Sequence, residues 1–391
     1  MRILVVTPEY PPQNVGGGGV VVRNLSTRLI ERGHQVRVLS GDFEAQSVTG
    51  DVRYQTDGGL SVDYVPYLPP ETNQLYSIYK PPALSYFHRL IQVLDSFEPD
   101  LIHLHGFGHV MVDTAAISAV IKSIPYVVTI HGIPREPERK GGILSSAFSI
   151  YSNTFGKFLL RHADRVIAVS EAIQEEVQDI CDSTQPVVIP NGIERGYGSD
   201  VELGTFRKQF DIDPEESLLL CVGALEERKG FQHAIQALPE ILNNHPKTQL
   251  IIVGRGSYRE ELERLIKQLD LENSVQLAGY VDEQTKKNAL ADADIVLIPS
   301  EEEPFGLTAL ESMSLGNAVI ASATGGLKDV IGMAGILVEP ASKTKIATPA
   351  SLLLDKPSFR DALEQESQNQ VQNFTWNSVL NQYEEVIENV A

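Results

Sequence analysis

The sequence is poor in features that mark several specialised classes of protein. Only two of its 391 residues are cysteines, Cys181 and Cys221, and their spacing fits no metal site. Cys221 lies in an apolar run and Cys181 follows a helical stretch, so we expect reduced packing residues in a cytoplasmic protein. The first ten residues lack the apolar core of a signal peptide. No stretch approaches the roughly 20 apolar residues of a membrane span, so none is expected.

Basic residues are also scarce. The chain has 32 Lys and Arg against 52 Asp and Glu, a formal net charge of −20, which disfavours non-specific binding to nucleic acid. The deficit is uneven, because residues 1–190 hold 15 basic and 20 acidic side chains and the remainder holds 17 and 32. The N-terminal half is therefore less repulsive toward an anionic partner or a lipid surface.

Short apolar runs that alternate with helical patterns recur along the chain. Buried strands are predicted at residues 3–7, 35–40, 101–104, 126–130, 165–170, 187–189, 218–222, 250–253, 275–277, 295–299 and 318–321. The length exceeds what one core usually supports, so two domains are expected. This alternation predicts an α/β protein with two doubly wound domains that face each other across a cleft.

The most informative stretch, residues 300–326, follows one of these strands. Pro304 disfavours helical backbone at Glu303, so Glu303 belongs to the loop at the carboxyl end of the strand, where α/β sheets bind ligands. The amides that come next are donors of a helix N-terminus, which favours an anion. They belong to Phe305, Gly306 and Leu307.

Glu303 and Glu311 are separated by seven residues around this helix start. One interpretation is that the acidic side chains complement the helix dipole and are solvated. The other is that the two carboxylates hold hydroxyl groups of a ligand whose phosphates lie on the amides, since a carboxylate accepts two hydrogen bonds from a diol.

The string EPFGLTALE resembles the E-x7-E motif of the retaining GT-B glycosyltransferases of family 4, including glycogen synthase-like and mannosyltransferase-like members. The resemblance covers nearly the whole chain. It implies GT-B architecture, with a Rossmann-like acceptor-binding domain at residues 1–190 and a Rossmann-like nucleotide-sugar-binding domain at 191–373. A C-terminal helix at about 374–391 is expected to cross back onto the first domain.

Four glycines at residues 16–19 precede a helix predicted at 20–32. A strand, a glycine loop and a helix N-terminus can cradle a phosphate, although a run of glycines also suits a flexible loop. The family opens in a similar way, from PP-x-x-GG to a helix that ends in RGH, a string also present at 32–34. The resemblance implies that Gly16 and Gly17 contact the donor.

His131 stands at the carboxyl end of the strand predicted at 126–130 and matches the family's T-x-H segment, whose histidine reaches the transferred sugar. The resemblance implies catalytic roles for His131 and Glu303. His103 and His105 match the family's H-x-H strand, and we expect them to be structural or to support the site.

A second basic segment matches the family's phosphate loop, G-R-x-x-x-x-K-G, at Lys229 and Gly230. The arginine of that pattern is replaced by Ala224, which puts one phosphate contact in doubt, and Arg228 is the predicted substitute. Tyr280 lies in a segment that matches the loop bordering the nucleotide base. With Glu311 on the ribose, these residues complete the expected donor site.

Asp292 and Asp294 imitate the metal-binding D-x-D motif of other glycosyltransferases, but they precede a strand instead of following one. Hard cations also require more oxygen ligands than this pair offers. We interpret both aspartates as structural and expect neither a metal nor another cofactor.

Two segments carry open alternatives. Residues 139–165 are rich in basic and aromatic side chains. This composition suits a solvated surface helix, and it also suits a segment in weak peripheral contact with anionic lipid on the inner membrane face. Residues 51–87 hold two Pro-Pro pairs and several tyrosines, which suits either recognition or ordinary packing.

Together these motifs predict a retaining, metal-independent glycosyltransferase that moves a hexose from a nucleoside-diphosphate sugar to an acceptor hydroxyl on a glycan, a lipid-linked molecule or a small molecule. UDP, GDP and ADP donors stay open. The alternatives are a sugar-nucleotide epimerase of the same architecture and a non-catalytic sugar-nucleotide-binding protein.

Overall fold

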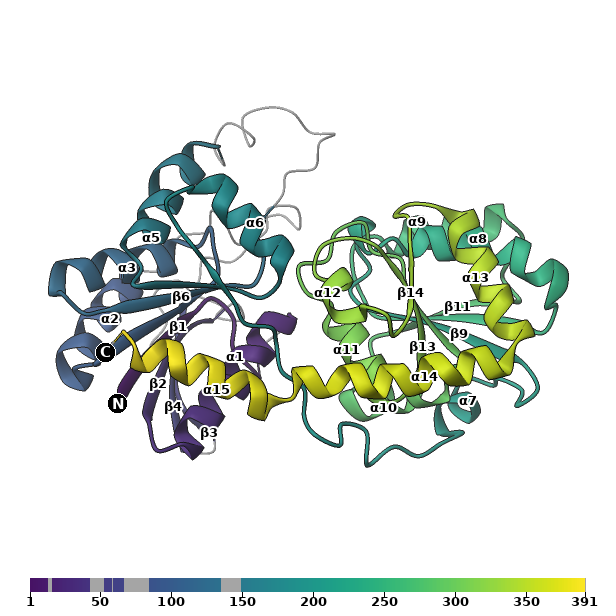
Figure 1. Cartoon of the computed structure of the whole chain (residues 1–391), viewed down its shortest axis with the longest axis horizontal. Coiled ribbons are helices and arrows are strands. Elements are labelled where there is room, and N and C mark those ends of the chain that lie inside the picture. The colour runs from purple at the N-terminus through teal and green to yellow at the C-terminus, as the bar shows by residue number, and fades with distance from the viewer. Residues whose placement is uncertain (13–15, 43–52, 58, 67–83, 135–148, 391) are drawn as a thin grey trace. The chain divides into compact units, whose positions relative to one another are not determined.

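The computed structural model describes the chain except residues 13–15, 43–52, 58, 67–83, 135–148 and 391. The chain forms two compact units (Figure 1). Unit 1 comprises Met1–Asn191 and Asn377–Ala391, and unit 2 comprises Gly192–Trp376. Each unit contains one sheet, so each has its own core.

Unit 1 is built on an eight-stranded sheet in the order β3-β4-β2-β1-β5-β6-β7-β8. All neighbours are parallel except β3 and β4. The strands are β1 (Arg2–Thr7), β2 (Gln35–Asp42), β3 (Arg53–Asp57), β4 (Leu60–Pro66), β5 (Leu101–His105), β6 (Tyr126–Ile130), β7 (Arg165–Ala168) and β8 (Val187–Val188). The helices are α1 (Gly17–Glu31), α2 (Leu84–Phe97), α3 (Val110–Lys122), the π-helix η3 (Ser152–Gly156), α5 (Lys157–His162), α6 (Glu171–Ile180) and α15 (Trp376–Glu388).

Unit 2 is built on a six-stranded parallel sheet in the order β11-β10-β9-β12-β13-β14. The strands are β9 (Ser217–Val222), β10 (Thr248–Val253), β11 (Val275–Gly279), β12 (Ile295–Ile298), β13 (Ala318–Ser322) and β14 (Ile336–Val338). The helices are α7 (Thr205–Gln209), η4 (Glu227–Lys229), α8 (Phe231–Asn244), α9 (Arg259–Gln268), α10 (Glu283–Asp292), α11 (Leu307–Ser314), α12 (Leu327–Ile331), α13 (Lys343–Asp355), α14 (Pro357–Val371) and η5 (Gln372–Phe374).

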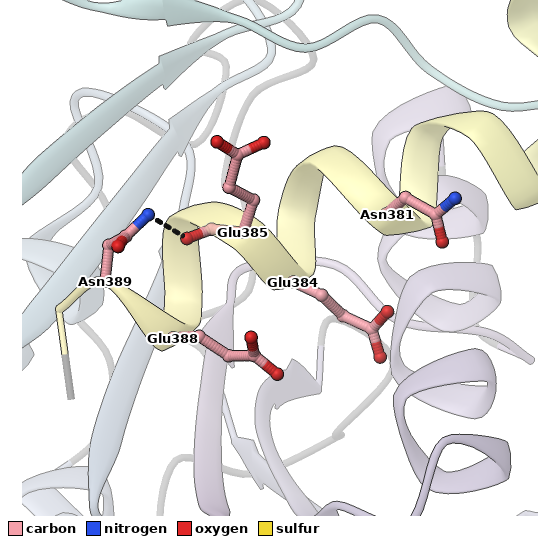
Figure 2. A pocket seen from close by; sticks show the side chains of 5 residues that line it. All are labelled: Asn381, Glu384, Glu385, Glu388 and Asn389. Atoms are coloured by element: carbon pink, nitrogen blue, oxygen red, sulfur yellow. Dashed lines mark hydrogen bonds between the residues drawn. The ribbon is translucent and has the colours of Figure 1, made fainter.

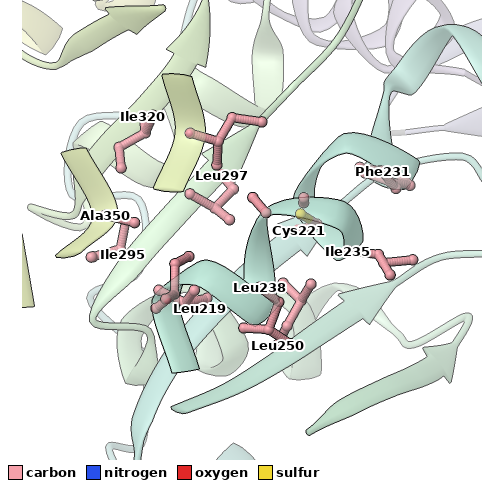
Figure 3. Packing of buried hydrophobic residues seen from close by; sticks show 14 of the residues in the cluster. Leu219, Cys221, Phe231, Ile235, Leu238, Leu250, Ile295, Leu297, Ile320 and Ala350 are labelled. Carbon is pink, nitrogen blue, oxygen red and sulfur yellow. The ribbon is translucent and has the colours of Figure 1, made fainter. Parts of the chain in front are cut away.

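The core of unit 2 shows why its strands read as continuous apolar runs. Alternate side chains of the central strands, such as Leu219 and Leu297, point to one face, where α8 covers them with Ile235 and Leu238 and α13 adds Ala350 (Figure 3). The intervening side chains point to the opposite face and are also buried. A parallel sheet covered on both faces needs this composition, because neither face reaches water.

The glycine run differs from its prediction. α1 begins at Gly17 instead of residue 20, so the last three glycines form its first turn, and Gly16 is the N-cap with extended backbone. The prediction of a loop was wrong because glycine's low helix propensity, about 1 kcal/mol per residue, was not decisive here. Val21, Leu25 and Leu29 of the same helix are fully buried, and this packing stabilises the whole helix.

Part of the segment 51–87, which was predicted to be irregular, forms regular secondary structure. Its first part contains the antiparallel pair β3–β4, and β4 also pairs in parallel with β2. Its last residues begin α2, which starts at Leu84. Residues 67–83, with both Pro-Pro pairs, lie outside the described residues.

The chain passes between the two units twice, and both passages meet at one point of unit 2. Ile193 forms a parallel bridge with Thr375, and the Ile193 amide donates to the Phe374 carbonyl at 2.8 Å. A side chain at Gly192 would lie 2.5 Å from the Trp376 ring, so this close approach requires glycine. The predicted C-terminal helix therefore begins at Trp376, after the turn of η5.

Candidate functional site

The order in which strands are added to the sheet of unit 2 reverses between β9 and β12. The chain adds β10 and β11 on one side of β9, and it then adds β12 on the other side. Loops that leave such a switch point form the ligand crevice of open α/β sheets. The loop after β9 contains Lys229, and the loop after β12 contains Glu303. The two loops are held together by the Glu301 amide, which donates to the Arg228 carbonyl at 2.8 Å.

Gly230 makes this loop contact possible. Its φ is +69°, and a Cβ there would lie 1.9 Å from the Pro299 carbonyl oxygen. No side chain fits in that space. The predicted phosphate loop and the predicted sugar loop are thus packed backbone to backbone at the carboxyl ends of neighbouring strands.

Lys229 and Glu303 are joined by an ion pair across these loops. The Lys229 Nζ lies 2.6 Å from the Glu303 Oε2, and the side chains are 18% and 13% exposed. Ser300 Oγ lies 3.4 Å from the same carboxylate oxygen. The backbone of Glu303 is fixed as well, because its carbonyl accepts from the Gly326 amide at 2.9 Å.

α11 starts directly after Glu303 and its proline. Gly306 is the N-cap with a φ of +110°, so the amides of Phe305, Gly306 and Leu307 lie at the helix start as predicted from the sequence. The Phe305 side chain is buried against Phe374, with ring centroids 6.1 Å apart. Of Phe305, only the backbone is therefore available to a ligand.

Glu311 lies one turn further along α11 and pairs with a residue that the sequence did not single out. The Lys286 Nζ is 2.8 Å from the Glu311 Oε1. Burial raises the pKa of Glu311, and the Lys286 charge opposes that rise. No motif marks Lys286, because it lies on α10, far from Glu311 in the sequence.

Arg228 is on the phosphate loop, but in this structure it pairs with Glu226 at 2.7 Å and is 43% exposed. Nearby, His233 Nε2 lies 2.7 Å from the Glu301 Oε1. The Arg228 guanidinium is at the surface of the loop, so its side chain can turn to a ligand.

Tyr280 is 69% exposed. The Arg255 guanidinium lies over its ring, 4.7 Å from the centroid, which is cation–π geometry. Arg255 belongs to the turn after β10, and the Gly254 amide donates to the Gly279 carbonyl at 2.8 Å. This pair forms an exposed aromatic and cationic surface beside the candidate phosphate loop, and sequence reasoning missed the arginine.

Asp292 and Asp294 have structural partners. Asp292 accepts hydrogen bonds from the amides of Gly204, Phe206 and Arg207 at 2.6–3.1 Å, which caps α7. Asp294 accepts from the Leu218 amide and from the Arg207 side chain, both at 2.8 Å. These contacts agree with the structural interpretation of both aspartates.

In unit 1, His131 lies at the carboxyl end of β6 beside the first turn of α1. A Cβ at Gly18 would lie 3.8 Å from its ring. The His131 Nε2 lies 3.0 Å from the His105 Nδ1, and the rings are stacked. Burial lowers the pKa of His131 to about 4, so the imidazole is neutral at pH 7.

The neighbouring histidines form a buried polar cluster. His103 Nε2 lies 2.8 Å from the Thr129 Oγ1, and its ring lies 5.8 Å from that of Tyr383 on α15. Both His103 and His105 are fully buried, and burial lowers the pKa of each. His105 contacts His131, and His103 contacts Thr129 of the neighbouring strand, which fits the structural or supporting role expected for both histidines.

Gly16 and Gly17 lie at the start of α1, and their backbone amides differ in the partners they have. The Gly16 amide donates to the Glu9 Oε2 at 2.9 Å, while Gly17 is the first residue of the helix. Burial raises the pKa of Glu9, and this hydrogen bond opposes the rise. An incoming anion would therefore compete with Glu9 for the Gly16 amide.

A separate pocket on unit 1 does not coincide with any predicted site residue. It is lined by one face of α15, with Asn381, Glu384, Glu385, Glu388 and Asn389 (Figure 2). Glu384 pairs with Arg32 at 2.7 Å. Three carboxylates make this pocket unsuitable for a diphosphate.

Both halves of the chain match family models of glycosyltransferases. Residues 15–196 match the model described as Glycosyltransferase Family 4, and residues 204–370 match the one described as Glycosyl transferases group 1. The chain is 30% identical over 397 residues to an uncharacterized glycosyltransferase of Methanocaldococcus jannaschii, covering 97% of this chain and 96% of that protein. It is 29% identical to the glycogen synthase of Mycobacterium tuberculosis, covering 97% and 92%.

Solved structures agree on the fold. Sucrose-phosphate synthase from Thermosynechococcus elongatus superposes with a TM-score of 0.83 at 21% identity, covering 99% of this chain and 98% of that one. Anabaena HepE in complex with UDP and glucose gives 0.75 at 22% identity, covering all of both chains.

The two parallel α/β units and these matches define a GT-B glycosyltransferase. The chain belongs to glycosyltransferase family 4. It is accordingly a transferase, which decides against the epimerase and the non-catalytic binding protein. Among the described residues, no helix is both long enough and apolar enough to cross a bilayer.

Proposed function

We propose that this glycosyltransferase transfers a hexose from a nucleoside-diphosphate sugar to an acceptor hydroxyl, with retention of configuration and without a metal ion. The observation that carries the proposal is the Lys229–Glu303 ion pair at the switch point of unit 2. It brings a phosphate-type cation and a sugar-type carboxylate to the same edge of the sheet, beside the N-terminal amides of α11.

The donor class is supported by two independent features. The exposed Tyr280, with Arg255 over its ring, offers a stacking surface for a base, and the partly buried Glu311 offers an acceptor for ribose hydroxyls. Among the structural relatives, Anabaena HepE has been crystallised with UDP-glucose. Unit 2 is the proposed nucleotide-sugar-binding domain, and unit 1, with the C-terminal helix, is the proposed acceptor-binding domain.

The chemistry follows from charge development. Breaking the anomeric C–O bond moves the electron pair to the diphosphate oxygen, and Lys229, Arg228 and the α11 amides stabilise that charge. The acceptor hydroxyl forms the new C–O bond on the same face of the sugar, and its proton passes to the departing phosphate oxygen. Glu303 stabilises positive charge on the sugar, and neutral His131 exchanges hydrogen bonds with sugar hydroxyls.

We base metal independence on the candidate metal ligands, whose carboxylates already accept hydrogen bonds from protein groups. Asp292 and Asp294 use their carboxylates on backbone amides and Arg207. Across the described part of the chain, no three His, Cys, Asp or Glu side chains cluster as a cation site would require. Cationic side chains and helix amides take the role of neutralising the diphosphate.

Turnover with UDP-, GDP- and ADP-hexoses tests this function. Incubation with a panel of acceptors in excess EDTA should give a glycoside whose anomeric configuration, read by NMR, equals that of the donor. An inverted product would overturn retention. Activity that is lost in EDTA and restored by magnesium or manganese would overturn metal independence.

A weak peripheral contact with anionic lipid on the cytoplasmic face of a membrane is a second part of the proposal. Ile150 and Phe155 are 65% and 53% exposed, and Lys157 and Arg161 follow on the same helical run. Exposed apolar and basic side chains together favour an anionic interface. The basic residues Arg139 and Lys140 of the predicted patch lie outside the described residues.

A further inference from the structure

The carboxylate of Glu311 is held by a lysine on another helix. Lys286 of α10 places its Nζ 2.8 Å from the Glu311 Oε1 and 3.0 Å from the Glu283 Oε2, and the Lys286 and Glu311 side chains are each only 20% exposed. No described residue donates a hydrogen bond to the other oxygen of Glu311, Oε2. The lysine thus occupies one oxygen of the carboxylate and leaves the second for a ligand.

The lysine is itself held in place. The Tyr197 hydroxyl donates to the Glu283 Oε1 at 3.0 Å, so Glu283 bridges the tyrosine and Lys286. The next lysine, Lys287, is directed elsewhere, since its Nζ pairs with Asp200 at 3.0 Å and lies 5.3 Å from the Tyr197 ring centroid. Two adjacent lysines of α10 therefore have different partners.

This arrangement offsets a desolvation penalty. Burial raises the pKa of Glu311, Glu283 raises it further, and Lys286 and, less strongly, Lys287 lower it. A buried carboxylate without a compensating charge takes up a proton, and a protonated carboxyl has one fewer strong acceptor for a diol. Lys286 is the main charge that opposes the burial-driven rise in the pKa of Glu311.

The other elements packed on α11 contribute little that titrates. α12 carries Lys328 and Asp329, and neither is among the charges that shift the pKa of Glu311. α14 meets the end of α11 through uncharged residues, with Ser367 donating to the Asn317 carbonyl and Gln368 beside Gly316. The charge of Glu311 is therefore controlled from α10.

We propose that Lys286 is a positioning residue for donor binding, which fixes Glu311 Oε1 so that Oε2 accepts the ribose hydroxyls. Tyr197 and Glu283 are the proposed supports of that lysine. The inference rests on the proposed role of Glu311 in holding the ribose.

Lys286→Met is the test, and Lys287→Met is the matched control, since it removes the same charge from the adjacent position. The probe is whichever of UDP, GDP and ADP binds the wild type most tightly by calorimetry. At pH 8 the Lys286→Met variant should bind about tenfold more weakly, as expected for one lost charge-assisted contact. Lys286→Arg should retain binding within a few-fold.

The pH dependence separates positioning from general destabilisation. Without Lys286, the pKa of Glu311 should rise further, so affinity should fall more steeply on acidification from pH 8 to pH 6 than it does in the wild type. The wild type and Lys287→Met should change little over that interval. If Lys286→Met fails to fold, Lys286→Gln removes the charge but retains a donor, and it should show the same pH dependence.

The outcomes distinguish the two levels of the proposal. Wild-type affinity and pH dependence in the Lys286→Met variant, together with weakened binding in Glu311→Gln, would overturn the role of Lys286 alone. Unchanged binding in Glu311→Gln, or no binding of any of the three diphosphates by the wild type, would overturn the ribose site and this inference with it.

Discussion

The Lys229 Nζ lies 2.6 Å from the Glu303 Oε2, so the two side chains form an ion pair across two loops of unit 2. Their predicted tasks differ, since the lysine is expected to contact phosphate and the glutamate to contact sugar. Each is therefore the temporary counter-charge of the other, and the ion pair must open when a donor binds.

We predict that alanine variants of Lys229 and Glu303 differ in their affinity for the bare nucleoside diphosphate. Lys229→Ala should weaken binding of the bare nucleoside diphosphate by about 2–3 kcal/mol, because a charge-assisted phosphate contact is lost. Glu303→Ala should leave that affinity nearly intact or slightly improve it, since Lys229 no longer has a competing partner. Calorimetry measures both, with turnover beside it.

Glu303→Ala should still depress kcat, because its contact matters most as the sugar gains positive charge. Glu301→Ala is the control, since Glu301 lies on the same loop as Glu303, pairs with His233 of α8 and is not expected to contact the sugar. Loss of diphosphate binding in Glu303→Ala, as large as in Lys229→Ala, would show that the sugar does not lie beside Glu303.

We expect Arg228→Ala to weaken diphosphate binding nearly as much as Lys229→Ala does, if Arg228 replaces the arginine missing at Ala224. Its present partner, Glu226, is the useful comparison. Glu226→Gln frees the guanidinium and should tighten binding modestly. Unchanged affinity in the Arg228 variant would refute the substitution and leave Lys229 as the principal side-chain contact.

We predict that His105 acts on catalysis through the ring of His131. Asparagine can place a polar atom near the position of a histidine Nδ1, whereas glutamine reaches toward Nε2. His105→Asn should therefore retain more of kcat than His105→Gln, because only the Nδ1 of His105 contacts His131, at 3.0 Å. Equal losses of kcat in both variants, at equal thermal stability, would contradict a positioning role.

The buried histidines should make the protein less stable as pH falls from 7 to 5. Burial lowers the pKa of His103 to about 3 and that of His131 to about 4, while an unfolded histidine titrates near 6.5. Between these values the unfolded chain binds more protons, so the free energy of unfolding decreases on acidification. Asp113, whose pKa burial raises to about 7, acts in the opposite direction, as a single group.

Urea unfolding at pH 7 and pH 5 measures this slope. His103→Gln should flatten it, and the exposed His88 provides the control, because His88→Gln should leave it unchanged. A slope that is identical in all three proteins would mean that other groups dominate the titration.

Vesicle flotation at low salt tests the lipid contact. The wild type should float with vesicles that contain anionic lipid, and a charge-reversed Lys157→Glu/Arg161→Glu variant should stay in solution, because attraction to the headgroups is lost. The matched variant Lys247→Glu reverses a charge on unit 2, where Lys247 pairs with Glu215, and should float normally. A wild type that stays in solution would assign the patch to ordinary surface.

Much of the fold could be predicted from the sequence, because parallel strands buried on both faces leave unmistakable apolar runs. Strand β6 has the predicted bounds, and several others differ by one or two residues. The pair β3–β4 was missed, since it lies at the sheet edge where polar residues interrupt the apolar pattern. The start of α1 was missed because tertiary packing overrides the low helix propensity of glycine.

The sequence allowed candidate site residues to be located where a loop follows a strand, and it missed partners that arrive from elsewhere in the chain. Glu303 and Lys229 could be placed, as each lies just beyond a recognisable strand. Lys286 and Arg255 could not, because their importance comes from what they contact, at 2.8 Å and 4.7 Å, and not from any local spacing.

The double passage of the chain beside Gly192 and Trp376 means that this protein cannot be divided into its two units by one cut. A fragment that stops at Asn191 would lack α15, whose fully buried Tyr383 packs beside His103. Separate expression of unit 1 therefore calls for a circular permutant in which α15 is joined ahead of β1. Unit 2, by contrast, is one uninterrupted stretch, so the proposed nucleotide binding can be tested on it as a genetically simple fragment.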